Sequence, residues 1–181
     1  YRLTDSALLL GIVGFSGQIP SLFLTPLAGV FADRTGRRKI LLTTQTVSML
    51  IALSVSVLIF SGHIKVWHII LSAVLNGISV AFDTPFRHAF LVNMVPDKKD
   101  LQNAIALNST LFNTARFAGP PLGGLLIAVS GEAVCFLING LSYLAVIWSL
   151  SLMKVNENPV KTEKASVLTD LLQGVQYSWK E

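Results

Sequence analysis

Two apolar runs are joined by the segment Gly29-Val30-Phe31-Ala32-Asp33-Arg34-Thr35-Gly36-Arg37-Arg38-Lys39. The runs, residues 8–28 and 40–60, each supply the ~20 residues that a helix needs to cross a ~30 Å hydrocarbon core. The segment between them carries one acid and four bases, which are costly to place in lipid, and Gly36 tolerates the positive φ angles that reverse a chain. We therefore expect a tight polar turn between two antiparallel membrane-spanning helices.

The composition agrees with a membrane protein. Of the 181 residues, 52% are hydrophobic and 13% are charged, whereas soluble domains carry about 25% charged residues. The 14 bases exceed the 10 acids, but they lie between apolar runs without interleaved aromatic residues, so we expect no nucleic-acid partner. The single cysteine, Cys135, excludes an internal disulfide, and the histidines lack zinc-site spacing, so we expect no metal and no cofactor.

Residues 1–153 are predicted to form one transmembrane helical bundle. Ser-Gly turn signals at 61–62 and 130–131 separate predicted spans, and Asp97 is expected to cap the start of the fourth. Residues 154–181 are predicted to be a cytoplasmic linker that contains an amphipathic helix. The five predicted spans are residues 7–31, 40–61, 66–86, 103–129 and 133–153.

The distribution of bases predicts the orientation in the membrane. Residues 29–39, 87–102 and 154–181 together carry 11 of the 14 bases. Loops rich in lysine and arginine remain in the cytoplasm. We therefore expect these three segments to be cytoplasmic.

One arginine lies inside a predicted span. Arg116 is near the middle of the fourth span, where an arginine costs about 2.5 to 3.5 kcal/mol on insertion scales. Ser109, Asn113 and Arg116 are spaced so that they share one helix face. They are candidates for the wall of a cavity that binds an anionic or hydrogen-bonding substrate. The alternative is a structural charge that carbonyls, or an acid on a helix outside this sequence, would satisfy.

The charged segment closely resembles the signature loop between the second and third helices of the major facilitator superfamily. Every position of the pattern G-x-x-x-D-R-x-G-R-R-K is matched. The run Gly119-Pro120-Pro121-Leu122-Gly123-Gly124 resembles the helix-kink motif G-x-x-x-G-P-x-x-G-G of superfamily exporters, although Ala115 replaces its first glycine. With Asp83-Thr84-Pro85-x-Arg87 and the run 103–109, the chain looks most like the bacterial branch that contains enterobactin and macrolide exporters.

The resemblance implies an all-α membrane protein. The chain would supply helices 2–6 of the N-terminal six-helix bundle of a twelve-helix transporter, with helix 1 mostly missing. The implied activity is secondary active export of a siderophore or drug-like molecule across the bacterial inner membrane, by alternating access and proton antiport. The implied partners are the lipid bilayer, a small-molecule substrate, protons and the C-terminal half of the same transporter.

The resemblance also implies a conformational latch at the cytoplasmic face. In the family an acid at the end of the fourth helix pairs with an arginine of the loop, so Asp83 is expected to meet Arg37. Ala73 stands where the family usually has an arginine within that helix, which leaves the proton-coupling residue open. The latch residues would be Gly29, Asp33, Arg34, Gly36, Arg37, Arg38, Asp83 and Arg87.

Two other classes of membrane protein compete with a transporter. The motif Gly14-Phe15-Ser16-Gly17 matches the G-x-S-G of rhomboid-type intramembrane proteases, whose serine needs a histidine base. His63, His68 and His88 are all expected at or beyond helix ends, out of reach of that serine. A scaffold without transport would explain the spans but not an arginine at mid-depth. We therefore expect a transporter and not an enzyme.

Overall fold

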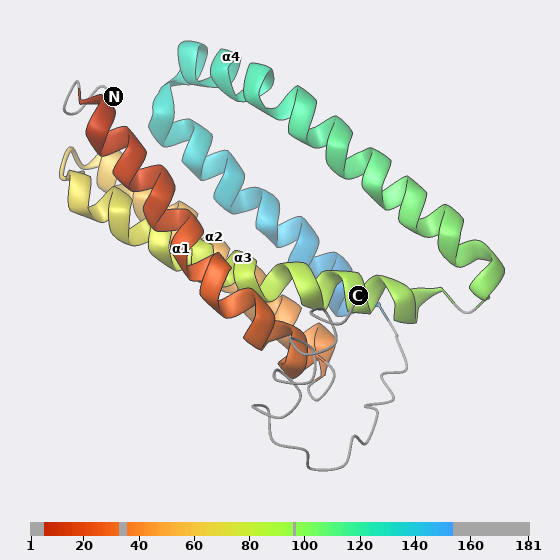
Figure 1. Cartoon of the computed structure of the whole chain (residues 1–181). Helices are drawn as coiled ribbons and strands as arrows, with labels where there is room; N and C mark the ends of the chain where they lie inside the picture. Colours follow the sequence, from red (N-terminus) through yellow and green to blue (C-terminus); the bar gives the residue numbers. More distant parts are fainter. Residues whose placement is uncertain (1–5, 33–35, 96, 154–181) are drawn as a thin grey trace.

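The computed structural model describes residues 6–32, 36–95 and 97–153. Its elements are α1 (Ala7–Ala32), α2 (Arg37–Phe60), α3 (Val66–Met94) and α4 (Lys98–Leu152), and the described residues contain no strand (Figure 1). Each of the four is long and apolar enough to cross a membrane. The predicted all-α membrane class is confirmed. The predicted linker, residues 154–181, lies outside the described residues.

Helix α4 consists of two arms that meet at a glycine. Gly131 has φ 81° and ψ 167°, which breaks the helical geometry between the first arm, residues 98–130, and the second arm, residues 132–152. Figure 1 shows the green-to-teal first arm and the blue second arm running antiparallel. Gly62, between α2 and α3, also has a positive φ of 71°. Glycine is the residue that adopts such angles without steric cost, so both Ser-Gly turn signals mark chain reversals.

Helices α3 and α4 extend furthest beyond the predicted spans. Helix α3 continues through Pro85 to Met94, past the predicted end at residue 86, because Phe90 on this extension is buried in the core. Helix α4 begins at Lys98, ahead of the predicted start at residue 103. The Asp97 side chain accepts a hydrogen bond from the backbone N–H of Lys99 at 2.9 Å, so the predicted N-cap is confirmed.

Helices α1 and α3 cross with their backbones in direct contact. A Cβ atom added to Gly77 would overlap the carbonyl oxygen of Gly17, and one added to Gly17 would lie 3.5 Å from the carbonyl oxygen of Ala73. Small residues allow membrane helices to approach this closely and gain dispersion contacts. The crossing explains why α1, which carries Pro20 and Pro26, remains packed on α3.

Helix α2 packs against the second arm of α4. The Ser56 hydroxyl donates a hydrogen bond to the carbonyl oxygen of Ala133 at 2.8 Å, and Ser56 is fully buried. A Cβ atom added to Gly140 would lie 2.6 Å from Cδ2 of Leu53. These contacts join α2 to the second arm along much of its length.

The buried apolar core lies at the end of the bundle where α2 begins and α4 ends. It draws on all four helices, although the first arm of α4 contributes nothing to it and no described side chain of that arm is buried. The core residues are Ala28, Leu41, Phe86, Phe90 and Leu150, with Ile40, Leu42, Phe82 and Met153 packed against them. The same end carries the described charged residues of the predicted latch, Arg37, Arg38, Asp83 and Arg87.

Candidate functional site

The carboxylate of Asp83 is the centre of the polar cluster at this end of the bundle. Its Oδ2 atom lies 2.7 Å from Nη2 of Arg87, one turn further along α3, and the two side chains are 15% and 52% exposed, respectively. Exposed ion pairs at this spacing contribute only about 0.3–0.5 kcal/mol. The half-exposed arginine alone therefore gives Asp83 little stabilisation.

The other oxygen of Asp83 is bound by helix α2. The Gln45 amide donates to Oδ1 at 2.6 Å. The Thr44 hydroxyl lies 3.2 Å from the same atom and 3.0 Å from the carbonyl oxygen of Leu41 on its own helix, so its single proton is shared between the two acceptors. Both donors are buried, and hydrogen bonds to ionised acceptors are about twice as strong as neutral ones. Neither residue was predicted from the sequence, although a Thr-Thr-Gln-Thr run inside an apolar span is a usable signal for a polar contact.

Two adjacent arginines connect the start of α2 to other helices. Nη1 of Arg37 donates to the carbonyl oxygen of Ala89 on α3 at 3.0 Å. Arg38 donates from Nε to the carbonyl oxygen of Leu150 at 2.7 Å and from Nη2 to that of Ser151. The carbonyls of a last helical turn lack intrahelical donors, so Arg38 caps the end of α4. These bonds hold three helix ends together.

Part of the predicted latch can be located and part cannot. Asp33 and Arg34 lie outside the described residues. Gly36 precedes the first residue of α2 with φ −58° and ψ 107°, so it does not use the positive φ that glycine tolerates and takes the extended angles of an N-cap residue. A Cβ atom added to Gly29 would meet nothing within 4 Å. The pairing of Asp83 with Arg37 stays a prediction.

The cavity candidates lie together on the first arm of α4. Ser109, Asn113 and Arg116 are all exposed, and so is Phe117 beside the arginine. The described helices leave this arm largely uncovered. The three polar side chains are therefore accessible to a substrate or to another helix, and their role in a cavity stays a prediction.

The glycine- and proline-rich motif lies further along the same arm. The helix continues through Pro120 and Pro121, and a Cβ atom added to Gly119, Gly123 or Gly124 would meet nothing within 4 Å. Among the described helices, none packs on this motif. Its role as a kink or packing surface stays a prediction.

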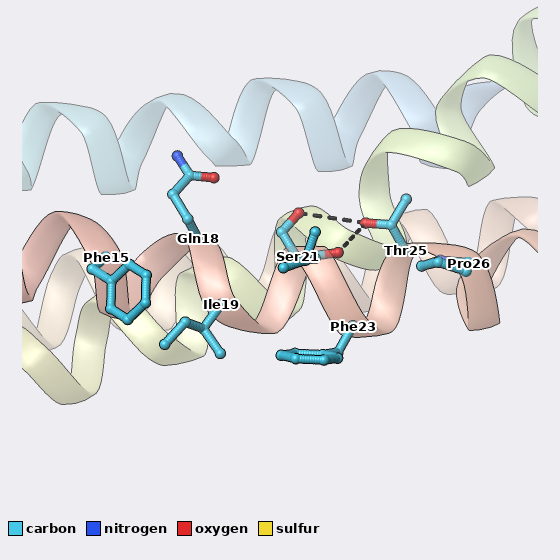
Figure 2. Close-up of a pocket in the computed structure, with 8 residues that line it drawn as sticks. Phe15, Gln18, Ile19, Ser21, Phe23, Thr25 and Pro26 are labelled. Carbon is cyan, nitrogen blue, oxygen red and sulfur yellow. Dashed lines mark hydrogen bonds between the residues drawn. The ribbon is translucent and has the colours of Figure 1, made fainter.

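Helix α1 carries a shallow groove on its exposed side. Figure 2 shows Gln18, Ser21 and Thr25 on one side of the helix, with Ile19 and Phe23 pointing away from them. The Thr25 hydroxyl donates to the Ser21 carbonyl oxygen at 2.6 Å, which satisfies this polar group within the helix. All lining residues come from one helix and most are apolar, as expected for a helix face in contact with lipid or another helix.

Metal chemistry has no support in the described part of the chain. No group of three histidine, cysteine, aspartate or glutamate side chains lies close enough there to hold a metal ion. The charged residues at the start of α2 and the end of α3 instead form contacts between helices. The arrangement can hold the ends of α2, α3 and α4 together.

A family model described as "Transmembrane secretion effector" matches residues 2–180. The staphyloferrin A transporter of Staphylococcus aureus is 34% identical over 157 residues, which cover 85% of this chain and 39% of that protein. The multidrug efflux pump Tap of Mycolicibacterium fortuitum is 27% identical over 184 residues, covering 96% of this chain and 44% of the pump. The multi-drug resistance efflux pump PmrA of Streptococcus pneumoniae is 28% identical over 162 residues, which cover 89% of this chain and 39% of that pump. The chain thus spans about two fifths of the length of these relatives.

Proposed function

Because this chain belongs to the Transmembrane secretion effector family of the major facilitator superfamily, we propose that it is part of an exporter of a small organic molecule. The family match carries the proposal, since it extends over residues 2–180. Relatives named as a staphyloferrin A transporter and as multidrug efflux pumps support a siderophore-like or drug-like substrate.

The exporter would work by alternating access. In this mechanism two helical bundles rock against each other around a site near the bilayer midplane. The helices of this chain would belong to one bundle, and the C-terminal half of the same transporter would form the other. Export would be coupled to proton antiport, as the resemblance to the exporter branch implies.

The chain is a multi-pass protein of a bacterial membrane: its helices are long and apolar enough to span one, and the matched relatives are bacterial. The membrane would be the inner one, with residues 29–39, 87–102 and 154–181 in the cytoplasm. The excess of bases in these segments supports this orientation.

The cluster around Asp83 would act as the latch of the cycle. Bonds from Arg37 to α3 and from Arg38 to the end of α4 support this role, because they join the helix ends that must move together. Asp33 would complete the cluster and stabilise the outward-facing state. Loss of Asp33, Arg37 or Asp83 is expected to slow export without preventing insertion into the membrane.

The face that carries Ser109, Asn113 and Arg116 would contact the substrate. A charged side chain at this depth is costly unless water or a partner meets it, and all three side chains are exposed. A guanidinium beside an amide and a hydroxyl suits an anionic or hydrogen-bonding molecule.

The competing classes have less support. Members of this family are transporters and not enzymes. Gly17, the last residue of the protease-like motif, packs against Ala73 of α3, which is the role of a small residue at a helix crossing. A scaffold without transport offers no reason for the exposed arginine on α4.

The test is export by the full-length transporter in proteoliposomes. Radiolabelled staphyloferrin A and ethidium serve as probes, with an imposed proton gradient and protein-free vesicles as the control. We expect gradient-dependent movement of at least one probe, reduced about 10-fold or more by Arg116→Ala and less by Arg116→Lys, if a charge-assisted contact of about 1.5–3 kcal/mol is lost. Thr114→Ala, at an exposed neighbouring position, is the matched control. Equal rates for Arg116→Ala and Thr114→Ala would contradict the assignment of the cavity face.

A further inference from the structure

The two oxygens of the Asp83 carboxylate have different environments. Oδ1 accepts a hydrogen bond from the Gln45 amide of helix α2 at 2.6 Å and lies 3.2 Å from the Thr44 hydroxyl, which is also 3.0 Å from the carbonyl oxygen of Leu41; both side chains are at most 8% exposed. Oδ2 faces the half-exposed guanidinium of Arg87 on its own helix. One oxygen is therefore bound across a buried helix interface and the other by a solvated cation.

The bonds to the two oxygens differ in persistence. A buried Gln45 amide that loses its acceptor is left unsatisfied in a medium that cannot replace the bond, whereas the Thr44 hydroxyl can still donate to the Leu41 carbonyl oxygen; the Gln45 bond to Oδ1 is therefore the expensive one to break. The Arg87 guanidinium is half exposed, so water can solvate it when it leaves Oδ2, although the carboxylate itself is only 15% exposed. Oδ2 can therefore exchange partners while Oδ1 remains attached to α2.

A second cation already contacts the same helix nearby. Arg37 binds the carbonyl oxygen of Ala89, which lies about 9 Å along the axis of α3 from Asp83. Arg37 is on α2, the helix that also supplies Thr44 and Gln45. The start of α2 thus contributes both a clamp for Oδ1 and a second cation that is bound to α3.

We propose that Thr44 and Gln45 are positioning residues, which clamp Oδ1 of Asp83 to α2 and leave Oδ2 as the atom at which cations exchange during transport. The proposal rests on the proposed function and adds residues that lie beyond the charged loop. Arg87 is the partner at Oδ2 in the present conformation. Without the bonds to Oδ1, the Asp83 carboxylate would rotate toward solvent. The latch would then lose the carboxylate that α2 holds in place.

The test uses the full-length transporter and four substitutions on α2. Thr44→Val and Gln45→Met remove the donors at nearly constant volume, and Thr44→Ser keeps the hydroxyl. Thr43→Val is the matched control, because the Thr43 hydroxyl is exposed and donates only to its own helix, at Lys39. Each of the first two changes is also made in an Asp83→Ala background.

Two measurements are made on each variant: export in proteoliposomes and amide hydrogen exchange of the purified protein. We expect Gln45→Met to lower export about 10-fold and to speed exchange about 10-fold in residues 37–45 and 83–94 alone, as for the loss of a bond to a charged acceptor. Thr44→Val should change both values in the same direction by a smaller factor, because the Thr44 hydroxyl also bonds the Leu41 carbonyl oxygen. Thr44→Ser restores both values, Thr43→Val changes neither, and the Asp83→Ala background abolishes the effects.

The outcomes separate the positioning role from the proposed function. Local exchange effects that depend on Asp83, in a protein that exports neither probe, would refute the proposed function and retain the clamp. Export with Thr44→Val and Gln45→Met equal to Thr43→Val would overturn the positioning role. Faster exchange spread evenly over the helices, including the far end of α2, would likewise overturn it, because it would indicate general destabilisation.

Discussion

Replacing Gly77 by alanine tests the close contact between helices α1 and α3. The added Cβ atom would overlap the carbonyl oxygen of Gly17, a backbone atom that cannot rotate away, so α1 and α3 must separate. Overpacking of this kind costs about 1–3 kcal/mol, and the separation also removes dispersion contacts around the crossing. We expect Gly77→Ala to lower the free energy of unfolding by about 2 kcal/mol or more.

Matched glycines make this expectation quantitative. A Cβ atom at Gly11 on α1 would meet nothing within 4 Å, so Gly11→Ala measures the intrinsic helix preference, about 1 kcal/mol in favour of alanine in water. Gly17→Ala would make an ordinary contact at 3.5 Å. Its effect on the free energy of unfolding should lie between those of Gly11→Ala and Gly77→Ala. The assay is thermal unfolding of the purified full-length protein in nanodiscs, with the amount of inserted protein as a second readout. Equal stability of Gly77→Ala and Gly11→Ala would refute the packing argument.

Three further predictions use the same unfolding assay. Arg38→Met removes the cap on the last carbonyls of α4 and should lower the free energy of unfolding by about 1.5–3 kcal/mol. Lys39→Met, at an exposed position, should have little effect. Equal losses of stability in the two variants would argue against the cap. Ser56→Ala removes a buried hydrogen bond from α2 to the Ala133 carbonyl oxygen of α4 and should cost about 0.5–1.5 kcal/mol, with the exposed Ser54→Ala as control. Gly131→Ala forces alanine to φ 81° and ψ 167°, a region almost restricted to glycine, and should cost about 1–3 kcal/mol, more than alanine at a glycine of ordinary helical φ in α4. An unchanged free energy of unfolding for Gly131→Ala would mean that the chain reversal does not depend on this glycine.

Several features of the fold follow from the sequence alone. Apolar runs of spanning length predict helices, because each residue has its own transfer free energy between water and lipid. The reversals at Gly62 and Gly131 follow from single residues that accept a positive φ. The cap at Asp97 depends on atoms two residues apart. All of these are local properties, so they can be read from a short stretch of chain.

The partners of the charged residues cannot be predicted from a short stretch of sequence. Helical spacing places Thr44 and Asp83 on faces of their own helices, but their bond depends on how α2 and α3 are rotated and shifted against each other. The overlap expected at Gly77 likewise depends on where α1 crosses α3, and the bonds of Arg38 depend on where α4 ends.

The sequence by itself therefore determined the class of the protein, its membrane helices and the charged loop. Only the tertiary structure decided that Gln45 and Thr44 hold Asp83, and that Arg38 closes the end of α4. The physical reason is that these bonds join residues far apart along the chain. Their energies depend on the relative placement of whole helices, which no local pattern of residues specifies.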